Sequence, residues 1–138
     1  MTPETALLVA GGLHLGFQAV VTVVVYPALA TTRAADWDAV HAAHSRRISL
    51  VVGPLYLAIA AACLWVLVAG PHSAAALVSV AGHAVAAGVT ATVAAPSHGR
   101  LGRAGSDGPD RAEIVRLLRA DRARLLATAV ALAAALLV

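Results

Sequence analysis

The sequence predicts an all-α fold, an integral membrane four-helix bundle with four transmembrane helices, in which residues 1–138 form a single domain. Of the 138 residues, 60% are hydrophobic and 12% are charged, whereas a soluble domain is about half apolar and a quarter charged. The apolar residues gather in four runs, and a membrane-spanning helix needs about 20 such residues. We expect spans over residues 6–26, 48–68, 74–95 and 120–138.

The charges indicate a topology. The ten basic residues are all arginines, and they lie in two segments of the chain, 33–47 and 100–124. Such grouping beside apolar runs is typical of loops on one side of a membrane, so we expect no nucleic-acid partner despite the net charge of +3. The positive-inside rule places segments 28–47 and 96–119 in the cytoplasm and both termini outside.

The connections follow from turn-forming residues. The first span is expected to end near Pro27, and the polar stretch 31–47 to run without a break into the second span, which Pro54 should kink. The stretch 70–72 predicts a tight turn that makes spans two and three antiparallel neighbours. Glycines and Pro109 predict a loop over 99–110, after which a charged helix continues into the last span.

Two histidines, His14 and His83, fall near the centres of spans one and three. Ionisable groups at that depth usually face the interior of a bundle. A pair at matching depth can bind one metal ion or the iron of a haem. The alternative is a neutral histidine that is hydrogen-bonded to a serine, a threonine or the carbonyl freed by Pro54.

A second set, His41, His44 and His98, lies at the predicted cytoplasmic edge of the membrane. The spacing of three residues puts His41 and His44 on one helix face. Three imidazoles from two segments can bind zinc, copper or iron, with Asp38 orienting a ligand. The alternative is that these histidines face lipid headgroups or water.

Further polar residues are candidates for a substrate pocket. Gln18 and Tyr26 share a helix face with His14, and Tyr56 lies in span two, where it can equally be a packing residue. Arg47 and Arg124 lie closest to the apolar boundaries, where they can hold an anionic group or face water and lipid phosphate. We expect no acidic residue or arginine within the membrane, which argues against an ion-coupled pump.

Several short motifs resemble one family of small bacterial four-span proteins. They are Tyr26-Pro27, Trp37, His41-x-x-His44-x-Arg46-Arg47-Ile48, Val52-x-Pro54-Leu55, Thr92-Val93-x-x-Pro96-x-His98-x-x-Leu101 and the stretch 117–124. Together they are similar to the anthrone-oxygenase-like (DUF1772) membrane family. The chain departs from that family at Asp121 and Arg122, where relatives often have Asn-Trp, and agrees again at Arg124. The resemblance implies a bacterial inner-membrane location and oxidation of an aromatic, polyketide-like substrate by dioxygen.

The resulting expectation is a membrane oxidoreductase, an oxygenase acting on a lipophilic aromatic molecule that enters from the bilayer. The expected catalytic residues are His41, His44, His98, Arg47 and Arg124, and the expected pocket residues are His14, Gln18, Tyr26, Tyr56 and His83. An ordinary histidine pKa near about 6.5 suits proton transfer at neutral pH. The cofactor is left open between iron, copper, zinc, haem b and none.

Two other functions fit the same residues. One is an electron-transfer protein that binds haem or a metal through His14 and His83, and the other is a structural or transport subunit without enzymatic activity. The small-residue helix faces are compatible with a homo-oligomer.

Overall fold

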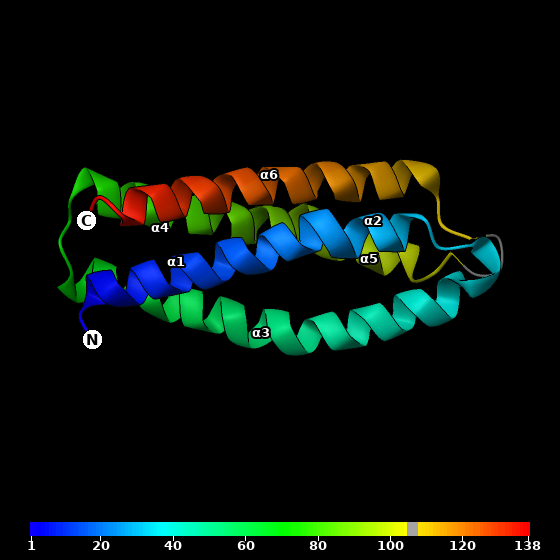
Figure 1. Ribbon diagram of the computed structural model, residues 1–138, viewed down its shortest axis with the longest axis horizontal. Helices are drawn as coiled ribbons and strands as arrows, with labels where there is room; N and C mark the ends of the chain where they lie inside the picture. Colours follow the sequence, from blue (N-terminus) through cyan, green and yellow to red (C-terminus); the bar gives the residue numbers. More distant parts are fainter. Residues whose placement is uncertain (105–107) are drawn as a thin grey trace.

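A computed structural model describes residues 1–104 and 108–138, and within these ranges every regular element is helical. Four rods run alternately up and down (Figure 1). The first rod joins α1 (Pro3–Val20), a π-helical turn (Val21–Val25) and α2 (Tyr26–Ala30). The second rod joins a 3₁₀ turn (Ala34–Asp36) and α3 (Trp37–Ala69). The third joins α4 (Ala74–Val89), a π-helical turn (Thr90–Ala94) and α5 (Ala95–Leu101). The fourth rod is α6 (Arg111–Ala135).

The helix starts use ordinary capping chemistry. The side chains of Thr2, Ser73 and Asp110 each accept a hydrogen bond from a backbone N–H of the first turn of α1, α4 and α6. The turn at 70–72 separates α3 from α4 as predicted. Local sequence signals therefore determine where the four rods begin, while packing determines their order around the bundle.

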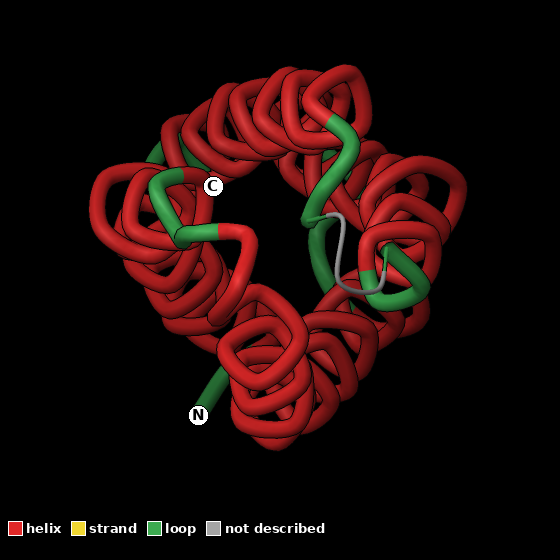
Figure 2. The backbone as a smooth tube through the Cα atoms, turned by 90° about the vertical axis from the view of Figure 1, so that its right-hand side faces the viewer, coloured by secondary structure: helices red, strands yellow, loops and turns green. Residues whose placement is uncertain are grey.

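The rods form a ring around a shared core (Figure 2). Helix α6 packs along both α4 and α1, and α1 also packs along α3, whereas α3 and α4 touch only lightly. A Cβ added to Gly82 would lie 2.8 Å from the carbonyl oxygen of Ala127, so the absent side chain lets α4 and α6 approach closely. Because α1 and α4 face each other diagonally, their inward side chains meet at the centre.

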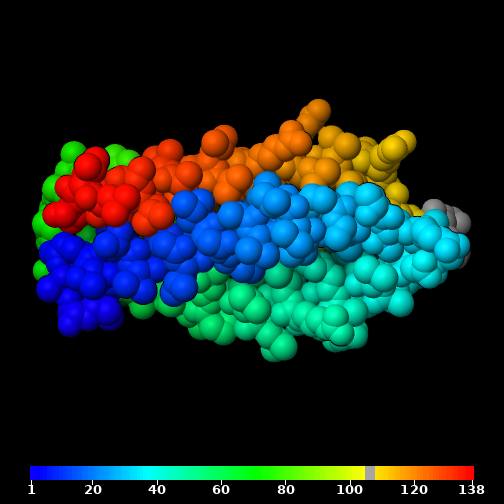
Figure 3. Space-filling model, in the orientation of Figure 1, coloured from blue at the N-terminus to red at the C-terminus, as the bar shows by residue number. Residues whose placement is uncertain are grey.

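Three rods, Pro3–Ala30, Ala34–Ala69 and Ala74–Leu101, are long and apolar enough to cross a membrane. They are longer than the predicted spans, because the first rod continues through Pro27, the second begins before residue 48, and the third continues to Leu101. Helix α5 therefore includes the first residues of the predicted loop 99–110. Pro27 lies in the first turn of α2, where its missing N–H is tolerated. The helix that carries the first predicted span therefore continues past Pro27 to Ala30. Figure 3 shows the resulting elongated molecule from one side.

The first and third rods repeat one design. Each contains a five-residue π-helical turn followed by a proline in the first turn of a short helix, Pro27 in α2 and Pro96 in α5. His14 and His83 are 69 residues apart, and the two π-helical turns begin at the same interval. Single π-helical turns are frequent at functional sites because they re-aim the side chains that follow. Tyr26 and His98 follow these two turns.

Candidate functional site

The inner histidine pair consists of His14 on α1 and His83 on α4. The Nδ1 atoms of the two rings are 3.0 Å apart, and the rings stack with centroids separated by 5.2 Å. The side chains are 0% and 2% exposed. The two histidines, which the sequence places at matching depth, contact each other directly, and neither bonds to a serine, a threonine or the carbonyl freed by Pro54. Since the rings are in direct contact, the arrangement does not support a haem held between them.

A buried ion pair lies beside the inner pair. Arg124 donates through Nη2 to the carboxylate of Asp121, at 2.9 Å, and to the hydroxyl of Tyr26, at 3.2 Å. Gln18 donates to the same carboxylate, and Arg124 Nη1 donates to the hydroxyl of Thr90. Asp121 and Arg124 are 1% and 5% exposed. Both residues lie within the predicted fourth span, 120–138, so the expectation of no acidic residue or arginine within the membrane does not fit that span.

The outer histidine pair consists of His41 on α3 and His98 on α5. His41 Nε2 is 3.2 Å from His98 Nδ1, and His98 Nε2 is 3.0 Å from the hydroxyl of Tyr26. Trp37 stacks on His41 with centroids 5.1 Å apart and donates its indole N–H to the carbonyl of Leu101. These contacts fix the rotamer of His41 and the position of α5.

A cavity of about 210 Å³ lies next to both groups. Its polar lining residues include Tyr26, His98 and Arg124 together with three hydroxyl residues, while Phe17 and other apolar side chains form much of its wall. The lining residues are Phe17, Val21, Tyr26, Ser45, Ile48, Ser49, Val52, Thr90, Ala94, Ala95, His98 and Arg124. A mostly apolar hollow with a few convergent polar groups is the usual form of a small-molecule site.

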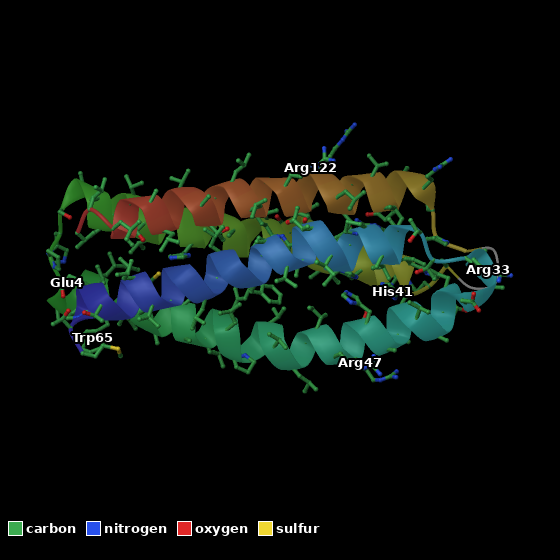
Figure 4. The ribbon with its side chains drawn as sticks, in the orientation of Figure 1. Glu4, Arg33, His41, Arg47, Trp65 and Arg122 are labelled. Atoms are coloured by element: carbon green, nitrogen blue, oxygen red, sulfur yellow. The ribbon has the colours of Figure 1, made fainter. Side chains whose placement is uncertain are left out.

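Not all of the predicted site residues join this arrangement. Arg47 is exposed and points away from the bundle (Figure 4). It lies one residue before Ile48, which lines the cavity, and successive residues on a helix point about 100° apart. Tyr56 bonds to the hydroxyl of Thr90 at 2.8 Å. The ring of Tyr56 also lies edge-on to His14.

The predicted metal ligands lie close to one another. His44 stacks on His98 with centroids 5.5 Å apart, and its Nε2 atom is buried without a hydrogen-bond partner. However, the described part of the chain contains no group of three or more histidine, cysteine, aspartate or glutamate side chains arranged to hold a metal ion. The role of His41, His44 and His98 as metal ligands stays a prediction.

A surface clamp joins α5 to the start of α6. Glu113 accepts hydrogen bonds from Arg100 and from the hydroxyl of Ser97, each at 2.6 Å. The hydrogen bond from Arg100, more than that from Ser97, lowers the pKa of Glu113 to about 2. Because α5 carries His98, this clamp holds one wall of the cavity.

Sequence reasoning missed the role of Asp121 and Thr90. The sequence signal for Asp121 was its spacing within α6. One set of residues recurs at intervals of four and three positions, and all of its members are buried: Leu117, Asp121, Arg124, Thr128 and Ala131. That spacing marks the inward face of a helix. The neighbouring Arg122 points outward (Figure 4).

Comparison with known proteins adds no relative to this picture. No family model matches the chain, and no curated protein or solved structure matches it.

Proposed function

We propose that the chain is a four-span membrane protein whose fourth span is α6. The membrane-crossing part is the predicted span 120–138, and the arginine-rich first half of α6 projects from the bilayer on the cytoplasmic side. A span this short is accommodated by local thinning of the bilayer. The outward residues of the span beyond Arg124 are apolar, with Leu126, Val130 and Leu137 at 68%, 54% and 79% exposed. The polar residues of its inner face are paired within the bundle, which removes the main cost of placing them in a membrane.

The proposed orientation rests on the arginines. Every arginine except Arg124 is exposed, and both arginine-bearing segments lie at the end of the bundle opposite to the two termini (Figure 1). By the positive-inside rule, that end faces the cytoplasm of a bacterium, and both termini lie outside its inner membrane.

Within this bundle we propose an oxidoreductase, an oxygenase acting on a lipophilic aromatic molecule. The observation that carries the proposal is the convergence of Tyr26, His98 and Arg124 on one mostly apolar cavity. Its volume of about 210 Å³ is below the roughly 300–1,000 Å³ of drug-sized sites. The cavity therefore favours one small ring system over an extended polyketide. The family resemblance noted above points to the same class of reaction.

The residues divide the chemistry between them. A neutral His98 accepts a proton from an acidic ring carbon, and the guanidinium of Arg124 stabilises the resulting enolate oxygen. The electron-rich ring then reacts with dioxygen. One oxygen atom bonds to the carbon, the hydroperoxide takes up a proton and loses water, and the CH₂ group becomes C=O. The sum is one CH₂ group and one O₂ converted into one C=O group and one H₂O.

Anthrone is a suitable probe for this activity. We expect the protein purified in detergent to consume one O₂ per anthrone converted to anthraquinone, followed by an oxygen electrode and by absorbance. His98→Gln should lower kcat by about 100-fold or more, since a positioned general base contributes about 10²–10⁴-fold. His72→Gln is the matched control, because His72 is exposed in the turn before α4. Conversion no faster than in empty detergent, or an unchanged rate in His98→Gln, would refute the proposal.

The inner histidine pair supports a different role for His14 and His83. The two Nδ1 atoms satisfy each other, the two Nε2 atoms are buried without a hydrogen-bond partner, and neither ring lines the central cavity. We propose that this pair fixes the distance between α1 and α4 and takes no part in the reaction.

A further inference from the structure

His98 separates two hollows of the molecule. One is the central cavity, which His98 lines together with Tyr26 and Arg124. The other is an open surface hollow between α3 and α5, lined by Asp38, His41, Ala42, Ser45, His98, Gly99, Gly102 and Arg103. His98 and Ser45 line both hollows, so the outer histidine pair forms part of the wall between the half-open central cavity and the surface hollow.

The hydrogen bonds across this wall are continuous. Tyr26 contacts His98 at Nε2, and His41 contacts the same ring at Nδ1. A neutral imidazole donates at one nitrogen and accepts at the other, so a proton gained at Nε2 can be released at Nδ1. His41 then carries the proton to its own Nδ1. A Cβ added to Gly102 would lie 3.6 Å from that nitrogen, so the absent side chain leaves it open to the hollow.

We propose that His41 and His98 form a proton-transfer path between the central cavity and the surface hollow, with His41 as the outer member. The path rests on the proposed function, since it would let His98 exchange with water the proton that it takes from the substrate and regain the proton that the peroxide later takes up. His41 does not touch the cavity, so it acts through His98 as a positioning and relay residue. The groups facing His98 are His41 and His44 from α3, Tyr26 from α2 and Arg124 from α6.

The inner histidine pair provides an internal reference for this path. It has the same type of ring contact, but its side chains are at most 2% exposed. His83 borders an almost wholly apolar hollow between α3 and α4, which offers a ring proton no hydrogen-bonded route to water, whereas a proton held by His98 can leave through His41. The two pairs should therefore exchange protons with water at different rates.

The test uses the full protein in detergent micelles with ¹⁵N-labelled histidine. We expect the ring N–H of His98 to exchange with water about tenfold or more faster than that of the inner pair, because access and not global opening governs it. His41→Phe, which keeps an aromatic ring against Trp37, should slow exchange at His98 by about tenfold or more. Gly102→Leu should also slow exchange at His98, although both histidines of the path are still present. The control His72→Phe should leave the exchange rate at His98 unchanged.

An unchanged exchange rate at His98 in both His41→Phe and Gly102→Leu would overturn the path. Its failure is distinguishable from failure of the proposed function. If exchange at His98 is slowed in the variants but the wild type does not convert anthrone, the path stands and the oxygenase proposal fails. If the wild type converts anthrone but exchange is unchanged in the variants, the oxygenase proposal stands and the path fails. If both hold, turnover of His41→Ala should be slowed and then restored by added imidazole, which a merely structural role of His41 would not produce.

Discussion

The inner and outer histidine pairs make the same kind of contact in different surroundings. In both, two ring nitrogens lie within hydrogen-bond distance, at 3.0 Å and 3.2 Å. The inner pair is at most 2% exposed and does not line the central cavity, although His83 borders an apolar hollow between α3 and α4. The outer pair lies between a cavity and a surface hollow. If the outer pair is reactive, as proposed above, then access, and not the imidazole contact itself, distinguishes it from the inner pair.

The buried ion pair connects the two regions. Arg124 reaches toward the outer pair through Tyr26, and Asp121 holds Gln18, one helical turn beyond His14. A charge held inside a bundle requires a partner, so the geometry of each histidine pair depends on this junction. The predictions below run from the largest expected effect to the smallest.

Removing the acidic partner should disturb both pairs at once. Asp121→Leu leaves Arg124 buried and uncompensated, and breaking such a pair costs about 3–5 kcal/mol of the free energy of unfolding. Denaturant titration in detergent, followed by circular dichroism, measures the loss. Arg122→Gln, one residue away but exposed, should stay within about 0.5 kcal/mol of the wild type. Equal effects of the two changes would contradict the assignment of Asp121 to the interior.

Removing one ring from each pair tests their difference. His14→Phe leaves the Nδ1 atom of His83 buried without a partner, which costs about 1–3 kcal/mol. His41→Phe should cost less, because the surface hollow lets water reach His98. The free energies of unfolding of the two variants, measured side by side, give the comparison. A larger loss in His41→Phe would mean that the outer pair is the structural one.

The seal around the inner pair can be loosened at Gly82. A side-chain methyl there would lie 2.9 Å from Cβ of Ala131, so Gly82→Ala should push α4 from α6 at a cost of about 1–3 kcal/mol. Ring-proton exchange at His83 should accelerate as well. Gly88→Ala is the control, since no atom lies within 4 Å of the added Cβ and helix propensity then favours alanine. Slower exchange at His83 in Gly82→Ala would argue against the packing described.

The clamp at Glu113 predicts an acid-sensitive contact between α5 and α6, in the region of the outer histidine pair and not of the inner pair. Its pKa is about 2 in the folded protein against 4.5 for the free side chain, so the stabilisation is present above pH 4.5 and is lost as the pH falls toward 2. Comparing the unfolding midpoints of wild type and Glu113→Gln at pH 6 and in acid measures it. The difference between the unfolding midpoints of the two proteins should become smaller in acid. A difference that becomes larger would contradict a stabilising role of the ionised Glu113.

Much of the fold was predictable from local patterns. The apolar runs predicted four helical rods, the turn at 70–72 placed α3 beside α4, and the depth of His14 and His83 predicted their meeting. These features depend on periodicity and length, which a single sequence records directly. The interval of 69 residues between the two histidines is visible in the sequence. Only the structure shows that the two π-helical turns begin at the same interval.

The site was only partly predictable because it depends on contacts between distant segments. Charge density over 110–124 favours an exposed helix, yet Asp121 and Arg124 are turned inward while Arg122 is exposed. Tyr26 reaches His98 across 72 positions of the chain, and no local pattern encodes that contact. The misplacement of Arg47 has the same origin, since proximity to an apolar boundary does not say which face of the helix a residue occupies.

The most direct test of the account is the protonation state of a ligand in the central cavity. Anthrone can be titrated into the protein without oxygen at neutral pH, and its absorbance distinguishes the neutral ketone from the enolate. The account predicts the enolate spectrum in the wild type and in His72→Gln, and the neutral spectrum in His98→Gln. Anthrone that binds only as the neutral ketone, or an enolate that forms equally well without His98, would contradict the central role given to Tyr26, His98 and Arg124.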